Sequence, residues 1–246
     1  MSDTLFLERC QSYIDCHLQR PKASLHPNLQ IAPSITLSRQ TGAGGITTAE
    51  HLAAWLTQYA PAPHGWTVFD KNLVNKVLED SKLPSRIAQF MPEDKVSSIS
   101  DAMEELLGLH PASWKLIRRT TETILQLAEL GHAILVGRGA NVITQHLKNV
   151  VHVRLVGSLH QRAERIMQLH KISRNAAASF IRKTDTGRQR YLKKYYGADP
   201  NDPLLYHLTI NTDEIPETDA ACLIGNWLLR KFYPEHTPAS LTASQT

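Results

Sequence analysis

The 246-residue chain has few cysteines and no long apolar run. Its three cysteines, Cys10, Cys16 and Cys222, have no metal-ligand spacing, and their odd number argues against a disulfide framework. No segment approaches the roughly 20 apolar residues of a membrane-spanning helix. Charged residues occur throughout residues 1 to 30, which therefore lack the apolar core of a secretory signal. We expect a reduced, cytoplasmic protein without a membrane segment.

Neither sign of charge dominates. The chain has 27 basic and 23 acidic residues, a net charge of +4, which suits a small anionic ligand as well as it suits nucleic acid. The twelve histidines show no metal-ligand pattern, and we predict no metal site built from side chains. With 42% hydrophobic residues the chain can bury a sizeable core. Its length favours one α/β domain with an inserted or appended subdomain.

A glycine-rich turn is the most informative stretch of the sequence. It follows an apolar, β-branched run, Ile35 to Leu37, and precedes a helical pattern that ends near Tyr59. Strand, glycine turn and helix is the arrangement that directs backbone N–H groups and a helix N-terminus at a phosphate. Glycine is required because a phosphate approaches the backbone more closely than a Cβ allows. The alternative is a tight turn that binds nothing, and the lysine expected in a phosphate-binding turn is absent.

Apolar runs of strand length recur along the chain and alternate with helical patterns. The predicted strands are residues 35–37, 66–69, 133–136, 150–155 and 206–211. Between residues 71 and 130 only helices are predicted, and the last of them ends at Gly131, which is typical of a C-cap. Ser158 and Gln161 form a capping box for a helix to about Leu169, and a helix over 218–232 closes the domain. This alternation predicts a parallel sheet covered on both faces, with ligands at the carboxyl ends of its strands.

A basic segment lies between residues 173 and 200. Its guanidinium groups, on Arg182, Arg188 and Arg190, suit the neutralisation of a phosphoryl group, and the alternative is a solvated basic helix. Asp185 and Gly187 predict a hinge or turn within this segment.

We expect three parts in the chain. Residues 1–30 form an N-terminal helical extension, 31–233 the main domain, and 234–246 a disordered tail. Within the main domain, residues 71 to 130 form a helical insertion.

Taken together, these motifs resemble the cytidylate kinase-like family of P-loop nucleoside monophosphate kinases over residues 34 to 231. The resemblance is carried by Ser38–Gly45, Phe69–Lys71, Val136–Ala140, Asp185–Arg188, Tyr191–Lys193 and Tyr206–Thr212. It implies an α/β fold of the P-loop NTPase type, a five-stranded parallel sheet with helices on both faces. It further implies that the insertion at about 71–130 binds an acceptor and that the basic segment is a lid. ATP and Mg²⁺ are the implied cofactors.

The sequence departs from cytidylate kinases proper at charged positions. In their loop pattern G-x-S-G-x-G-K-G-T, Arg39 stands for the first glycine, Gly45 for the lysine and Ile46 for the glycine after it. Val136 and Gly139 stand for the two carboxylates of their D-G-R-D motif. Since side-chain carboxylates are missing there, Mg²⁺ would be held mainly through the nucleotide phosphates.

The resemblance and the residues together predict the site. Arg39, Arg182 and Arg188 are the predicted catalytic residues, and they replace the absent lysine. Asp70 and Arg138 are predicted to bind the acceptor. The predicted ATP phosphate-binding residues are Thr41, Gly42, Ala43, Gly44, Gly45, Ile46 and Thr47.

Three functions are consistent with the sequence. The first is an ATP-dependent phosphotransferase acting on a nucleoside monophosphate, cytidylate-like, or a related small phosphate acceptor. The second is a catalytically weak or inactive nucleotide-binding regulatory protein, whose N-terminal helix would serve a protein partner or self-association. The third is a dinucleotide oxidoreductase, suggested by residues 41–45 alone and disfavoured by the basic segment and the absence of Tyr-x-x-x-Lys. A nucleotide is the expected partner in the first two, and no nucleic acid is expected.

Overall fold

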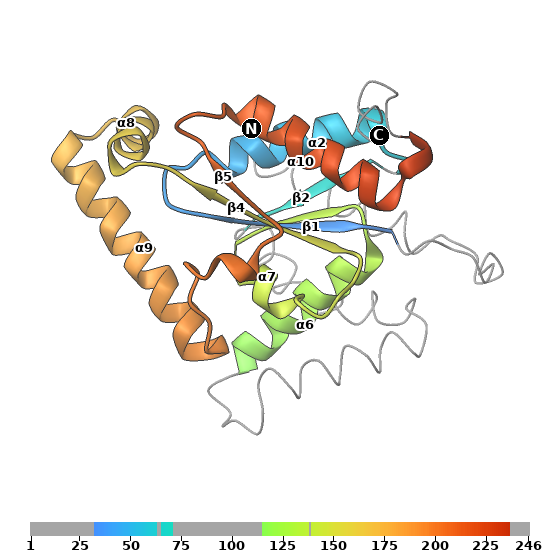
Figure 1. Ribbon diagram of the computed structural model, residues 1–246. Helices are drawn as coiled ribbons and strands as arrows, with labels where there is room; N and C mark the ends of the chain where they lie inside the picture. The colour runs from blue at the N-terminus through green and yellow to red at the C-terminus, as the bar shows by residue number, and fades with distance from the viewer. Residues whose placement is uncertain (1–31, 63–64, 71–114, 138, 237–246) are drawn as a thin grey trace.

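The computed structural model of the protein describes residues 32–62, 65–70, 115–137 and 139–236 (Figure 1). The predicted N-terminal helical extension over residues 1–30, most of the predicted helical insertion and Arg138 lie outside these residues. So does the expected tail beyond residue 236, whereas its first residues, Pro234–His236, form the short 3₁₀ helix η4. Within the described part of the chain, no helix is long and apolar enough to cross a membrane.

Five parallel strands form one sheet in the order β2-β3-β1-β4-β5. All five predicted strands are confirmed. They are β1 (Ser34–Arg39), β2 (Thr67–Phe69), β3 (Ala133–Val136), β4 (Val150–Val156) and β5 (Leu208–Asn211). Because the strands are parallel, their carboxyl ends share one edge of the sheet, and the glycine loop follows the central strand β1 at that edge.

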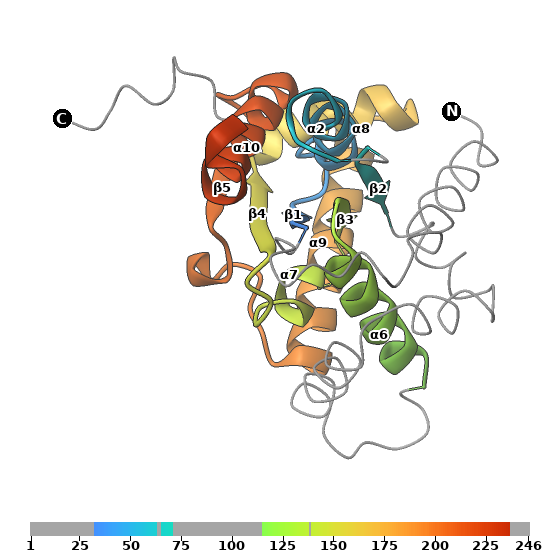
Figure 2. The same ribbon diagram turned by 90° about the vertical axis from the view of Figure 1, so that its right-hand side faces the viewer.

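Helices cover both faces of the sheet (Figures 1 and 2). One face carries α2 (Gly45–Tyr59) and α10 (Glu217–Phe232), and the other carries α6 (Lys115–Leu130) and α7 (Ala140–Ile143). Two further helices, α8 (Leu159–His170) and α9 (Arg174–Tyr196), form a hairpin at the carboxyl edge. A 3₁₀ helix, η3 (Pro203–Leu205), precedes β5. Ser158 caps α8 as predicted, since its Oγ accepts a hydrogen bond from the Gln161 N–H, but the capping box is not complete because the Ser158 N–H donates to Asp213 Oδ2 instead.

The predicted hinge at Asp185 and Gly187 is wrong. The basic segment is one continuous helix of 23 residues, with Ser173 as its N-cap and Gly197 as its left-handed C-cap. Glycine within a helix is unfavourable by only about 1 kcal/mol relative to alanine. The packing of Asp185 against the glycine loop, described below, supplies contacts that a turn would lose.

The two faces of β1 differ in chemistry, and this difference positions the site. Ile35 and Leu37 are fully buried in the main core beneath α2 and α10. The alternate residues Ser34, Thr36 and Ser38 face the other side, because side chains alternate along a strand. Ser34 Oγ donates to the Ala128 carbonyl of α6, and Thr36 Oγ1 lies 2.8 Å from His152 Nδ1 of β4. This polar row leads towards the carboxyl edge.

His152 gives the fold a testable pH dependence. Burial, helped by the charges of His207 and Lys231, lowers the pKa of His152 from 6.5 to about 3. The unfolded chain therefore binds a proton that the folded chain does not, between these two values. This contribution to stability is complete above pH 6.5 and is lost as the pH falls towards 3.

We expect the free energy of unfolding to fall by about 1 kcal/mol between pH 7.5 and pH 5.5, which lowers Tm by roughly 3 °C. Thermal unfolding at the two pH values measures this difference. In the His152→Gln variant most of the difference should disappear, whereas the exposed His146→Gln variant should retain it. The assignment to His152 fails if both variants keep the wild-type difference.

Candidate functional site

The glycine loop has the backbone of a phosphate-binding turn. Gly42 and Gly44 adopt φ angles of 83° and 72°, in the left-handed region that strains other residues. Gly44 is the N-cap of α2, where no side chain caps the helix and the first turn contains no acidic residue. The free N–H groups at this helix start are the donors that bind phosphate oxygens in other proteins.

Arg39 lies in the space that a loop lysine would need. A Cβ added to Gly45 would be 2.8 Å from Arg39 Cγ, so the arginine stem runs directly beside this position. The guanidinium end reaches Gly137, after β3, where an added Cβ would overlap Nη1. Position 45 therefore has no room for a side chain while Arg39 keeps this conformation. The sequence therefore has a cation at position 39 instead of position 45. The side chain of this arginine passes Gly45, and its guanidinium lies against Gly137.

A carboxylate of α9 binds Thr41, the first residue of the loop. Asp185 Oδ1 accepts hydrogen bonds from the Thr41 N–H at 2.8 Å and from Thr41 Oγ1 at 2.6 Å. Its Oδ2 forms an ion pair with Arg162 Nη1 at 2.7 Å. Arg188 Nη1 donates to Thr41 Oγ1 at 2.8 Å and lies 3.4 Å from Asp185 Oδ1. These contacts attach the basic helix α9 to the glycine loop.

Two arginines of α8 that the sequence motifs did not indicate also support the loop. Arg162 donates to the Thr41 carbonyl at 3.1 Å. Arg165 donates to the Thr212 carbonyl at 2.6 Å and forms an ion pair with Glu217 at 3.3 Å. Their spacing of three residues, on the helix after β4, places both on one face and was the available signal.

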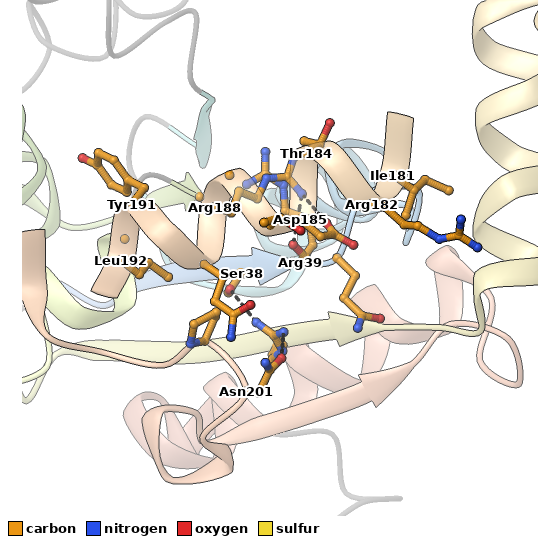
Figure 3. A pocket seen from close by; sticks show the side chains of 18 of the residues that line it. Ser38, Arg39, Ile181, Arg182, Thr184, Asp185, Arg188, Tyr191, Leu192 and Asn201 are labelled. Atoms are coloured by element: carbon orange, nitrogen blue, oxygen red, sulfur yellow. Dashed lines mark hydrogen bonds and ion pairs between the residues drawn. The ribbon is translucent and has the colours of Figure 1, made fainter. Parts of the chain in front are cut away.

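A cavity of about 630 Å³ opens between the carboxyl ends of the strands and α9 (Figure 3). Its lining includes five arginines: Arg39, Arg154, Arg162, Arg182 and Arg188. Asp185 is the single acidic residue among the described residues of the lining. The pKa of Arg188 is lowered from its usual value, mainly by burial. The neighbouring Asp185 carboxylate partly offsets this effect, and the nearby charge of Arg154 adds to it. This excess of cations suits a ligand with several negative charges.

The structure brings the three predicted catalytic arginines to this one cavity. Arg39 and Arg188 lie close to Asp185, whereas Arg182 is exposed and extends away from it (Figure 3). The loop residues 41–47 lie next to the cavity but do not line it. Their predicted roles stay predictions.

The two predicted acceptor-binding residues are not placed at the cavity. Asp70 follows β2, the edge strand two positions from β1, and is not part of the lining. Arg138 lies outside the described residues, although its neighbours Gly137 and Gly139 line the cavity. Within the described ranges, no group of three or more His, Cys, Asp or Glu side chains could hold a metal ion.

The five-stranded parallel sheet, the glycine loop after β1 and the arginine-bearing helix form an α/β fold of the kinase-like class. The chain belongs to the cytidylate kinase-like family, whose model matches residues 34–214. The family match confirms the resemblance that the motifs carried.

Other similarities are more distant. An uncharacterised protein from Eubacterium ventriosum, of known structure, is 18% identical and superposes with a TM-score of 0.54, covering 80% of this chain and 97% of that one. Shikimate kinase from Acinetobacter baumannii in complex with shikimate is 12% identical, with a TM-score of 0.40 and coverage of 84% and 98%. A uronate isomerase of Corynebacterium glutamicum is 27% identical over 125 residues, 51% of this chain. The match spans 24%, about a quarter, of that isomerase.

Proposed function

We propose that the protein transfers the γ-phosphoryl group of ATP to a nucleoside monophosphate, cytidylate-like, or to a related small phosphate acceptor. The observation that carries this proposal is the position of Arg39. Its stem packs beside Gly45, which stands where cytidylate kinases proper have the loop lysine, and its guanidinium reaches Gly137. Phosphoryl transfer depends on positioning and charge neutralisation more than on covalent participation by the protein. A guanidinium from position 39 can therefore serve the same purpose.

The residues around the loop would have different roles in binding and transfer. The N–H groups at the start of α2 would hold the ATP phosphates, and Arg39 and Arg188 would neutralise the transferring group. The acceptor phosphate is already ionised, so no general base is needed. Phosphate oxygens would also compete with the Asp185 carboxylate for the Thr41 N–H and hydroxyl.

The described residues fit a metal that is held by the substrate. No carboxylate cluster is present among them, and Mg²⁺ accepts phosphate oxygens and waters as most of its ligands. Thr47, exposed in the first turn of α2, offers a hydroxyl to such an ion. The ion would neutralise charge on the phosphates.

The experiment that tests the proposal is single-turnover phosphoryl transfer from labelled ATP to a panel of nucleoside mono- and diphosphates, with hydrolysis to ADP measured in parallel. We expect transfer to at least one monophosphate. ATP that binds with no ADP formed in the presence of any acceptor would contradict the phosphotransferase.

Such a result would support the second function, nucleotide binding without turnover. One observation favours that alternative. Val136 is apolar and buried at the end of β3, where cytidylate kinases proper have a carboxylate. The loop and its arginines would then serve ligand-dependent closure, with α9 as the moving element.

Arg188→Met should lower the transfer rate by about 10²-fold, because Arg188 is the lid arginine closest to the loop. Single-turnover rates measure this change. Lys193→Met removes an exposed charge from the same helix and should leave the rate near that of the wild type. Equal rates for the two variants would remove Arg188 from the catalytic group.

A further inference from the structure

Arg154 is a buried cation whose described partners are all uncharged. It lies on β4 with 7% of its surface exposed. Its guanidinium donates to Tyr206 Oη at 3.1 Å and to Asn201 Oδ1 at 3.0 Å, with a longer contact of 3.4 Å to Ser38 Oγ. It also lies over the Tyr206 ring, 5.4 Å from the centroid. Among the described residues, no carboxylate lies within ion-pair distance of it.

Arg162 illustrates the partners of a buried arginine with a structural role in this protein. Its side chain is similarly buried, but it has the Asp185 carboxylate and the carbonyls of Thr41 and Gly157 as partners. Burying a charge without a counter-charge is unfavourable unless a bound group supplies one. Arg154 therefore differs from Arg162 in lacking an anion.

The surroundings of Arg154 open into the cavity beneath α9. Ser38, Arg154 and Asn201 all line it. Asn141 and Tyr191 line it as well, and the Nδ2 of the first and the hydroxyl of the second are buried without a hydrogen-bond partner in the described part of the chain. Arg154 lies near enough to Arg188 for its charge to help lower the pKa of Arg188. An anion between them would relieve this repulsion.

We propose that Arg154, held by Asn201 and Tyr206, is a binding site for the phosphate group of the acceptor. Arg154 contacts this phosphomonoester from the sheet, and Arg188 faces it from α9. The identity of the ligand as the acceptor rests on the proposed function, but the binding of a phosphate does not. The site selects phosphorylated acceptors over their uncharged nucleosides, because a nucleoside would leave the Arg154 charge unpaired.

Equilibrium titration of the full chain with inorganic phosphate, CMP and cytidine tests the site. Two variants remove the charge: Arg154→Met, and Arg154→Gln, which keeps a polar group for Asn201 and Tyr206. Both should weaken phosphate and CMP binding at least tenfold, and cytidine should bind no variant appreciably. Arg230→Met, which removes an exposed charge on α10, should bind as the wild type does. Phosphate binding that is weakened by Arg39→Met but by neither Arg154 variant belongs to the loop and overturns the proposal.

Thermal unfolding separates a binding role from a structural one. Phosphate should raise the Tm of the wild type and of Arg230→Met but not that of either Arg154 variant. Without phosphate, Arg154→Met should unfold at the wild-type temperature or above it, since the substitution removes an unpaired buried charge. A Tm several degrees lower in both Arg154 variants, with phosphate binding retained, would make Arg154 a structural residue. Arg154-dependent phosphate binding without any ATP turnover would support the site while contradicting the proposed kinase.

Discussion

Arg39→Met should lower the rate of phosphoryl transfer by about 10³-fold while the protein stays folded. Methionine keeps the apolar stem that packs beside Gly45 but removes the guanidinium that reaches Gly137. The loss should appear mainly in the rate and less in ATP affinity, because the backbone N–H groups of the loop remain. Single-turnover transfer and ATP titration measure the two effects separately.

The geometry around Arg39 allows a sharper experiment than removal of its charge. Gly45→Lys alone should impair the protein, because its Cβ would lie 2.8 Å from Arg39 Cγ and would displace the arginine. Arg39→Gly alone leaves the loop without a cation. The double variant Arg39→Gly/Gly45→Lys matches the loop pattern of cytidylate kinases proper up to the lysine, except that Thr41 stands for its serine, and returns the cation to position 45.

We expect the double variant to transfer phosphoryl groups within about tenfold of the wild-type rate, although each single variant loses about 10²-fold or more. Recovery of the transfer rate in the double variant would mean that the effects of the two substitutions are strongly coupled, as expected for positions in contact. Additive losses in the double variant would show that Arg39 does not replace the lysine. Full activity in Arg39→Gly would show that no loop cation is needed.

Most of the fold could be predicted from the sequence, because parallel strands buried on both faces appear as short apolar runs. The run at 133–136 and the glycine turn before α2 are local signals that tertiary packing did not change. The predicted hinge at Asp185 and Gly187 was wrong because tertiary contacts outweighed the local signal there. Its composition suggested a turn, but the contacts of Asp185 with Thr41 across the site keep the segment helical.

The candidate site was less accessible to sequence reasoning than the fold. Arg154 lies in the run Val150–Val156, where it indicates only a strand. Its position on the cavity side follows from a register that pairs it with Ser38 on β1 and Thr209 on β5. The compensation between Arg39 and Gly45 likewise depends on where a side chain runs in space. The sequence showed that the lysine is missing and indicated Arg39 as its replacement. That Gly45 and Gly137 leave the space for the Arg39 side chain could be seen only in the structure.

Asp185→Ala should lower the free energy of unfolding by about 2 kcal/mol, or Tm by roughly 6 °C. Arg162, whose side chain is 9% exposed, would keep a nearly buried charge without its counter-charge, and Thr41 would lose the acceptor of two hydrogen bonds. Removing one member of a fully buried ion pair lowers the free energy of unfolding by more than this. The smaller effect is expected because the Asp185 side chain is 29% exposed, so water can reach Arg162 once Asp185 has been replaced.

The pair Glu164 and Arg174 provides the matched control for Asp185, because its carboxylate is similarly accessible (32%) whereas its arginine is exposed (57%). Glu164→Ala removes an ion pair of the same α8–α9 hairpin and should change the free energy of unfolding by about 0.5 kcal/mol or less. Thermal unfolding of both variants decides whether the Asp185 contacts matter more. Phosphate adds a second comparison. Because an anion can occupy the place of the lost carboxylate, inorganic phosphate should raise the Tm of Asp185→Ala by more than that of the wild type. Equal Tm values for the two variants, or equal stabilisation by phosphate, would mean that Asp185 does not hold an anion-binding position of the loop.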